Sequence, residues 1–174
     1  MRARGRGSAV AVVVVMSTIL AQWGCHVNLG SRTIGAMKPL TSREIRLWNA
    51  WELFAEGVSS RISHEVAEAT GLSAADYRVL SCLVDRGHGQ LRQRDLAIAL
   101  AWDKSRISHQ LTRMQARNLL KRTKTAERGS NVAITAAGRT ALESARPVHA
   151  DSVRRYLIER LTPDQVAAIL AMRD

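Results

Sequence analysis

Two short helical segments separated by only two residues constrain the fold of this chain more than any other feature. Apolar periodicity predicts helices at about 92–101 and 104–118, and the tight junction between them consists of Trp102 and Asp103. Asp103 is a good N-terminal cap for the second helix, because its carboxylate can accept a hydrogen bond from a first-turn backbone N–H. Two helices joined this closely are typical of a helix-turn-helix.

Two short segments after these helices predict a β-hairpin. They lie at about 119–125 and 131–135, and the residues at 127–130 form a turn between them. A hairpin that follows a helix-turn-helix forms the wing of a winged helix-turn-helix. The sequence therefore predicts a mainly α fold with a small β-hairpin wing.

Longer helices are expected on both sides of this core. Their starts are marked by capping side chains or by a first-turn Pro: Thr41 or Ser42, Ser73, Thr135 and Pro163. Glycines mark the ends of the first two helices at Gly71 and at 87–89, and the helix after the hairpin is expected to end at about Leu161. One domain is therefore expected at 38–174. Its expected parts are a core at about 73–135 and outer helices at about 41–70 and 136–174.

Positive charge is concentrated in the middle of the chain. The formal net charge is +11, and residues 86–128 hold eleven Lys or Arg against three acidic residues, which is a net +8. A solvated basic face and a polyanion-binding surface are both consistent with such a charge run. Its position in the helix-turn-helix and wing favours the second interpretation.

The segment expected as the second helix has an apolar side and a polar side. Ile107, Leu111 and Met114 recur at spacings of four and three residues and should face the core. The other side carries donors for base edges or phosphates: Ser105, Arg106, Ser108, His109, Thr112 and Arg113. In a helix-turn-helix this second helix lies in the major groove, so we expect binding to double-stranded DNA.

The same stretch resembles the MarR family of winged helix-turn-helix transcriptional regulators. The resemblance is carried by LRQRDLAIALAWDKSRISHQLTRMQARNLLKR and by NVAITAAGR after the wing, and it extends over about 40–173. It implies a homodimer whose dimerisation region is formed by the first and last helices, here about 41–69 and 148–172. It also implies a transcriptional repressor, released from DNA by a small phenolic or other ligand in many members.

Two positions depart from the family pattern. The family usually has Asp two residues before the wing-tip Arg, and here Ala126 stands two residues before Arg128, with Glu127 beside it. The bracing of a wing-tip Arg128 in the minor groove is therefore in question. Asn118 stands where the family usually has Gly before a Leu pair, and Asn tolerates left-handed backbone geometry.

Eleven residues are predicted to contact DNA, and they come from the helix-turn-helix and the wing. They are Arg92, Arg94, Lys104, Ser105, Arg106, Ser108, His109, Arg113, Lys121, Arg122 and Arg128. For His109, contact with DNA and simple exposure are equally consistent with its position. Trp48 and Trp51 on the first helix are assigned either to the dimer core or to an effector pocket.

The remaining polar and sulfur-containing residues indicate structural roles. His64 and His149 are expected to be exposed or satisfied histidines rather than metal ligands. Cys82 lies in an apolar helical run and is expected to be a buried thiol rather than a redox sensor. No catalytic constellation, phosphate-binding loop, metal site or cofactor site is evident, so an enzyme is not expected.

Residues 1–37 precede the expected domain. Arginines followed by an apolar run resemble a signal peptide, and the run is too short to span a bilayer. Since export would separate a DNA-binding protein from DNA, we favour a disordered tail or a start at Met16 or Met37, and a cytoplasmic protein without a membrane partner. The alternatives are an exported protein of unknown role and a winged-helix protein-interaction module that has lost DNA binding.

Overall fold

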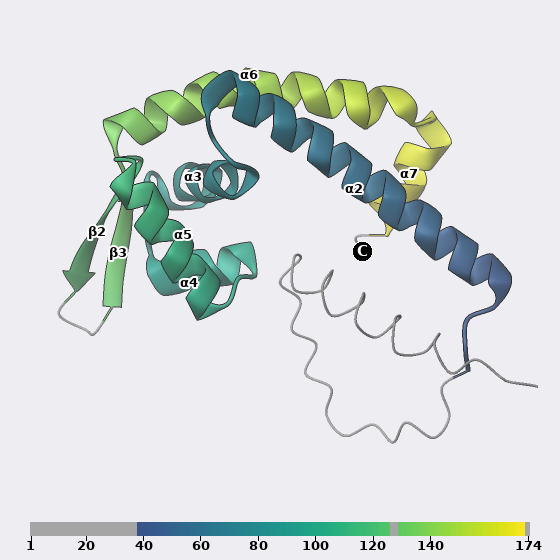
Figure 1. The fold of residues 1–174 in the computed structure, drawn as a ribbon, viewed down its shortest axis with the longest axis horizontal. Helices are drawn as coiled ribbons and strands as arrows, with labels where there is room; N and C mark the ends of the chain where they lie inside the picture. The colour runs from purple at the N-terminus through teal and green to yellow at the C-terminus, as the bar shows by residue number, and fades with distance from the viewer. Residues whose placement is uncertain (1–37, 126–128, 173–174) are drawn as a thin grey trace, which may run out of the picture.

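The computed structural model describes residues 38–125 and 129–172, which form a mostly helical domain with one small sheet (Figure 1). Two long helices, α2 (Ser42–Thr70) and α6 (Ala136–Tyr156), lie side by side along one edge of the molecule. Three shorter helices and the sheet form a compact lobe under one end of this pair. These helices are α3 (Ala74–Gly87), α4 (Gln93–Leu100) and α5 (Lys104–Ala116).

The sheet has three antiparallel strands in the order β1-β3-β2. Its strands are β1 (Gln90–Arg92), β2 (Leu120–Thr125) and β3 (Gly129–Ile134). Val132 in the central strand pairs with Leu91 on one side and Arg122 on the other. Since β2 follows α5 directly, this pairing places the hairpin beside the second helix of the helix-turn-helix. The fold is a winged helix-turn-helix, as the sequence predicts.

Capping side chains begin the helices where the sequence predicts them. Thr41 and Ser73 each form a capping box with an acidic residue three positions later. Thr135 accepts a hydrogen bond from the backbone N–H of Gly138 at the start of α6. The last helix, α7 (Pro163–Ala171), has Pro in its first turn and a cap at Thr162. Each cap satisfies a first-turn N–H group that the helix itself leaves unpaired.

Apolar residues from every element of the lobe meet in one core. Ile107, Leu111 and Met114 on α5 are buried, which confirms the predicted inner face of that helix. They pack with Leu80 and Leu83 of α3 and with further core residues: Leu96, Trp102, Leu120, Val132 and Leu142. The core therefore holds α5 at a fixed angle while its opposite face lies at the surface.

Four predicted boundaries differ in the structure. The turn expected at 127–130 is shorter, because Gly129 and Ser130 belong to β3 and pair with Thr125 and Lys124. Arg92 was expected to begin a helix and the two residues before it were assigned to no element, but 90–92 form β1 and α4 begins at Gln93. This three-residue strand exists because it pairs with β3, a contact with no local sequence signal. The helix α5 ends at Ala116 rather than near residue 118, and α6 ends at Tyr156, before the short 3₁₀ helix η2 (Ile158–Arg160).

Among the described residues, three non-glycine residues adopt left-handed backbone geometry at turns of the lobe, and they are His88, Ala101 and Asn118. Asn118, between α5 and β2, has φ = 56°, which confirms the tolerance expected of Asn there. Ala101, between α4 and α5, has φ = 53°, and its backbone N–H closes the end of α4 on Ala97 and Ile98. Within the described ranges, no helix is long and apolar enough to cross a membrane.

Candidate nucleic-acid interface

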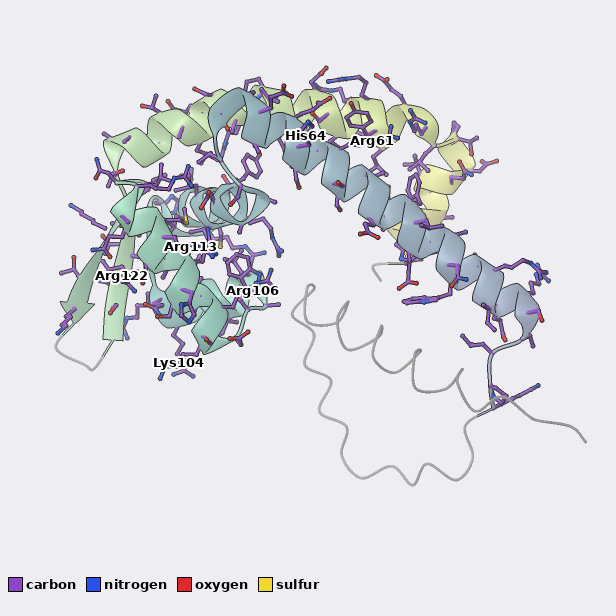
Figure 2. All side chains as sticks on the ribbon, viewed as in Figure 1. Arg61, His64, Lys104, Arg106, Arg113 and Arg122 are labelled. Atoms are coloured by element: carbon purple, nitrogen blue, oxygen red, sulfur yellow. The ribbon has the colours of Figure 1, made fainter. Side chains whose placement is uncertain are left out.

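The polar face of α5 is exposed on the side of the lobe opposite the core. Lys104, Ser105, His109, Thr112 and Arg113 are exposed, as expected for the outer face of the helix. Arg106 and Ser108, which were predicted to face fully outward, are half-buried. Figure 2 labels Lys104, Arg106 and Arg113 along α5 and Arg122 beside β2, so four cationic side chains lie on or near this helix.

Neighbouring elements extend this basic surface on two sides. Arg92 and Arg94 are exposed at the start of α4, and Lys121 and Lys124 are exposed on β2. Arg128, predicted at the wing tip, lies outside the described residues together with Ala126 and Glu127. Its contact with DNA therefore stays a prediction.

Arg122 connects the wing to α5. Its Nε donates to Gln115 Oε1 at 2.9 Å, and its Nη2 donates to Thr112 Oγ1 at 3.1 Å. Both acceptors are on α5, and Arg122 itself is half-buried. The residue therefore fixes the position of β2 relative to the helix, which its prediction as a DNA contact did not anticipate.

A buried polar network supports α5 from the other side. Asp76 is only 2% exposed, and its carboxylate accepts from Gln110 Nε2 at 2.6 Å and from Arg117 Nη1 at 2.7 Å. The Gln110 carbonyl accepts in turn from Arg113, an exposed residue of the predicted DNA-contacting face. Arg117 also donates to the backbone carbonyl of Gly71 at 2.8 Å, so the network joins α5 to the start of α3 and the end of α2.

The start of α5 is capped by Asp103. Its Oδ1 accepts from the Arg106 backbone N–H at 2.8 Å, and this hydrogen bond holds the pKa of the Asp103 carboxyl below its usual value. The carboxylate stays ionised there and complements the positive end of the helix dipole. A phosphate at this helix end would have to bind beside the carboxylate.

Trp102 packs beneath the first turn of α5 and contacts two arginines. The Cζ atom of Arg106 lies 4.4 Å from the centroid of the Trp102 ring, and that of Arg78 lies 5.5 Å from it. Trp102 is buried, and Arg78 also donates to the Leu100 carbonyl. Burial, and then the charge of Arg106, lower the pKa of Arg78 from its usual value. The sequence showed Trp102 only as a junction residue.

Large apolar side chains remain exposed on the helices outside the lobe. Trp48 is 42% exposed and Trp51 is 50% exposed on α2. Six others share this exposure on α2, η2, α7 and the residue that follows it: Ile45, Leu47, Leu53, Ile158, Leu170 and Met172. Contiguous exposed apolar surface is typical of sites that contact another protein.

A cavity of about 200 Å³ lies between α2 and the end of α6. It is lined by Leu53, Phe54, Gly57, Val58, Arg61, Tyr156 and Arg160. Trp48 and Trp51, the residues predicted for an effector pocket, do not line it. Beside it, Glu65 joins the two helices by accepting hydrogen bonds from Ser152, Tyr156 and Arg155.

The surroundings of His149, His64 and Cys82 indicate structural roles. The His149 ring stacks on Tyr77 with a centroid distance of 4.5 Å, and burial lowers the pKa of His149. His64 is exposed on α2 (Figure 2). Its Nε2 lies 3.8 Å from Glu68 Oε2. Cys82 is buried, and burial raises the pKa of its thiol. Among the residues that the structure places, no group of three or more metal-binding side chains occurs.

Solved structures of transcriptional regulators are similar to this chain. AbsC of Streptomyces coelicolor, described as a MarR family transcriptional regulator, is 29% identical with a TM-score of 0.69, over 76% of this chain and 90% of AbsC. Sco3205 of the same organism, a MarR family regulator solved in complex with DNA, is 24% identical with a TM-score of 0.74, over 80% of this chain and 88% of its own.

A third similar structure is of a protein whose DNA binding is described as regulated by a small molecule. BpsR of Bordetella bronchiseptica, described in terms of the regulation of its DNA binding by 6-hydroxynicotinic acid, is 22% identical with a TM-score of 0.63, over 73% of this chain and 95% of BpsR. No protein-family model matches the sequence, and no curated protein is significantly similar to it.

Proposed function

We propose that this chain, a winged helix-turn-helix protein of the MarR type, regulates transcription by binding double-stranded DNA as a homodimer. The observation that carries the proposal is the exposed polar and basic face of α5, which is flanked by the exposed lysines of β2. A helix held at a fixed angle by its buried side, with donors on its other side, is suited to the major groove. The DNA complex of the similar regulator Sco3205 supports this reading.

We assign different roles to the basic residues of this surface. Arg106, in the first turn of α5, is placed to bond a guanine, whereas Lys121 at the start of the wing is placed for phosphate. Arg128 is assigned to the minor groove beside the wing. Arg122, which follows Lys121, is also assigned to phosphate. The other predicted contacts serve either role, and they are Arg92, Arg94, Lys104, Ser105, Ser108, His109 and Arg113.

The test of DNA binding is a selection of duplexes from a random pool by the full chain, followed by affinity measurements over a range of salt concentrations. We expect one near-palindromic sequence and a steep salt dependence, with a slope near −0.9 per phosphate neutralised. Failure to select a sequence, or affinity that is nearly independent of salt, would contradict the proposal.

Three variants separate the roles of the basic residues. Arg106→Ala should cost about 1–3 kcal/mol on the selected duplex and relax base preference at one position in each half-site. Lys121→Ala should weaken all duplexes equally and reduce the salt slope by about one. Arg128→Ala should reduce the preference for narrow A·T-rich minor grooves. As a matched control, Arg46→Ala removes an exposed charge at the start of α2, far from α5 (Figure 1). It keeps the exposed apolar side chains of α2, so it should leave DNA binding unchanged.

The proposed dimer uses the exposed apolar surface of α2, η2 and α7. Leu53→Asp should convert the protein to a monomer in sedimentation analysis, because it places a charge in that surface. Ile98 is equally apolar and exposed, but it lies on α4 in the lobe. Ile98→Asp should therefore leave the dimer intact, and a wild-type monomer at micromolar concentration would contradict the proposal.

We further propose that the protein represses transcription and that a small aromatic or phenolic effector releases it from DNA. The effector part of this proposal is supported by BpsR, whose DNA binding is described as regulated by 6-hydroxynicotinic acid. Repression is what the resemblance to the MarR family implies. Titration of a phenol and of a hydroxylated aromatic acid into the protein–DNA complex tests it by fluorescence anisotropy. Release by at least one of the two is expected, and full retention of DNA at millimolar concentrations of both would contradict it. Trp48→Ala and Trp51→Ala test whether either tryptophan contacts the effector.

A further inference from the structure

The junction between α4 and α5 carries a buried tryptophan with two positively charged neighbours. Trp102 is buried, yet its ring contacts the guanidinium groups of both Arg78 and Arg106. Its indole nitrogen is buried and makes no hydrogen bond among the described residues. The indole N–H therefore does not hold the ring in place, and the two cation–π contacts are the specific interactions of the Trp102 side chain.

The ring is fixed in place by the backbone around it. Ala101, in left-handed geometry, turns the chain sharply after α4, and the Trp102 backbone N–H donates to the Ala97 carbonyl at 2.9 Å. Asp103 then begins α5 and binds the backbone N–H of Arg106. The Trp102 ring and the backbone of Arg106 are thus both anchored to the turn. The Arg106 side chain is restrained at both ends, since its Cα is fixed and its guanidinium contacts the ring.

We propose that Trp102 is a positioning residue for DNA recognition, whose ring orients the Arg106 guanidinium and thereby sets the base discrimination of α5. This inference rests on the proposed function. A guanidinium that stacks on an aromatic ring uses its face for the contact, and its N–H groups point outward from its edge. Restraint of the side chain before binding also removes part of the entropy that a flexible Arg loses when it bonds a base.

A purely structural role for Trp102 makes a different prediction. Loss of core packing lowers stability, and it weakens binding to matched and mismatched duplexes by the same factor. A positioning role acts through Arg106 alone. It changes the ratio of the two affinities, and the change disappears when Arg106 is absent. The ratio therefore distinguishes the two roles.

The experiment is a double-mutant cycle on duplexes selected by the wild-type dimer. Affinities are measured for the selected duplex and for duplexes mismatched at each position, with Trp102→Leu, Trp102→Phe, Arg106→Ala and the Trp102→Leu/Arg106→Ala pair. Leu keeps the site apolar without a ring, and Phe keeps a ring face. Circular dichroism and thermal unfolding verify that each variant is folded.

We expect Trp102→Leu to lower discrimination about 2- to 30-fold at the position that depends on Arg106, the range that a cation–π contact supports. Trp102→Phe should retain at least half of the wild-type discrimination, and Trp102→Leu should change it by less than about twofold in the Arg106→Ala background. If Trp102→Leu does not fold, Trp102→Phe provides the measurement, in the presence and in the absence of Arg106. Any loss of discrimination in Trp102→Phe should then disappear in the Arg106→Ala background.

Two results would overturn the inference and leave DNA binding in place. One is a Trp102→Leu variant with wild-type discrimination, and the other is an equal loss with and without Arg106. A wild-type protein that selects no sequence would instead overturn the proposed function, and the inference with it.

Discussion

Replacement of the buried Asp76 by Ala should destabilise the protein much more than the same change at the exposed Asp85. Each carboxylate pairs with one arginine, Asp76 with Arg117 and Asp85 with Arg146. The side chain of Asp85 is 56% exposed and that of Asp76 is 3% exposed. The two positions therefore carry the same kind of ion pair in very different solvent environments.

The magnitude follows from the partners that Asp76 leaves behind. Its carboxylate also accepts from the Ser73 backbone N–H at 3.0 Å as part of the α3 capping box, and loss of this N-terminal bonding costs about 1 kcal/mol. The buried Gln110 amide loses its acceptor, which costs about 1–3 kcal/mol. Arg117 has a side chain that is 47% exposed and can regain water, so it adds little.

The expected loss is therefore about 2–4 kcal/mol for Asp76→Ala and about 0–1 kcal/mol for Asp85→Ala. Urea unfolding followed by circular dichroism measures both, at one protomer concentration because dimerisation contributes to stability. Equal losses for the two variants would refute the reasoning, since burial of the network would then have no energetic consequence. Asp76→Ala should also weaken DNA binding, because Gln110 no longer has a fixed orientation toward Arg113.

Three further outcomes are expected. Gly138→Ala should lower the free energy of unfolding in urea by about 3 kcal/mol or more, because the new Cβ would lie 2.0 Å from the Leu119 carbonyl oxygen. Gly57→Ala is the matched control: no atom lies within 4 Å of the new Cβ, so the change should stabilise α2 by up to about 1 kcal/mol. Hydrogen bonds from Ser152 and Tyr156 hold the pKa of Glu65 below its usual value, so its contribution to stability is complete above the unfolded-state pKa and is lost as the pH falls through the folded-state pKa. Acid unfolding of Glu65→Gln should therefore show a smaller pH dependence than that of wild type. In a variant that lacks the other cysteine, Cys82 should react slowly with a thiol reagent when the protein is folded and rapidly in denaturant. Fast reaction of the native protein would show that the thiol is accessible.

Local signals in the sequence were sufficient for the order of the helices and for the inner face of α5. A cap such as Ser73 and a spacing such as that of Ile107 and Leu111 act within a few residues, so both are visible in the chain itself. The strand β1 was missed because its three residues are extended only through their pairing with β3, about forty residues later. The early end of α6 likewise has no marker in the sequence.

The candidate site shows the same division between local and distant contacts. The basic residues of α5 and β2 were identified from spacing and charge. The side chains that hold them were not, because Asp76 lies 34 residues from Gln110 and 41 residues from Arg117 along the chain. The packing of Arg106 on Trp102 is close in sequence, but a junction residue gives no indication of which side its ring will face.

The attachment of α5 to the end of α2 through Arg117 has a mechanical consequence. The 29 residues of α2 make a rod of roughly 44 Å at 1.5 Å per residue. If the far end of such a rod is held by a second protomer, a rotation of about 5° displaces the lobe by about 4 Å, more than the rise of about 3.4 Å between successive base pairs. In the proposed dimer, α2 is therefore a lever arm, and a tilt too small to disturb its packing is enough to take the two recognition helices out of register with the DNA.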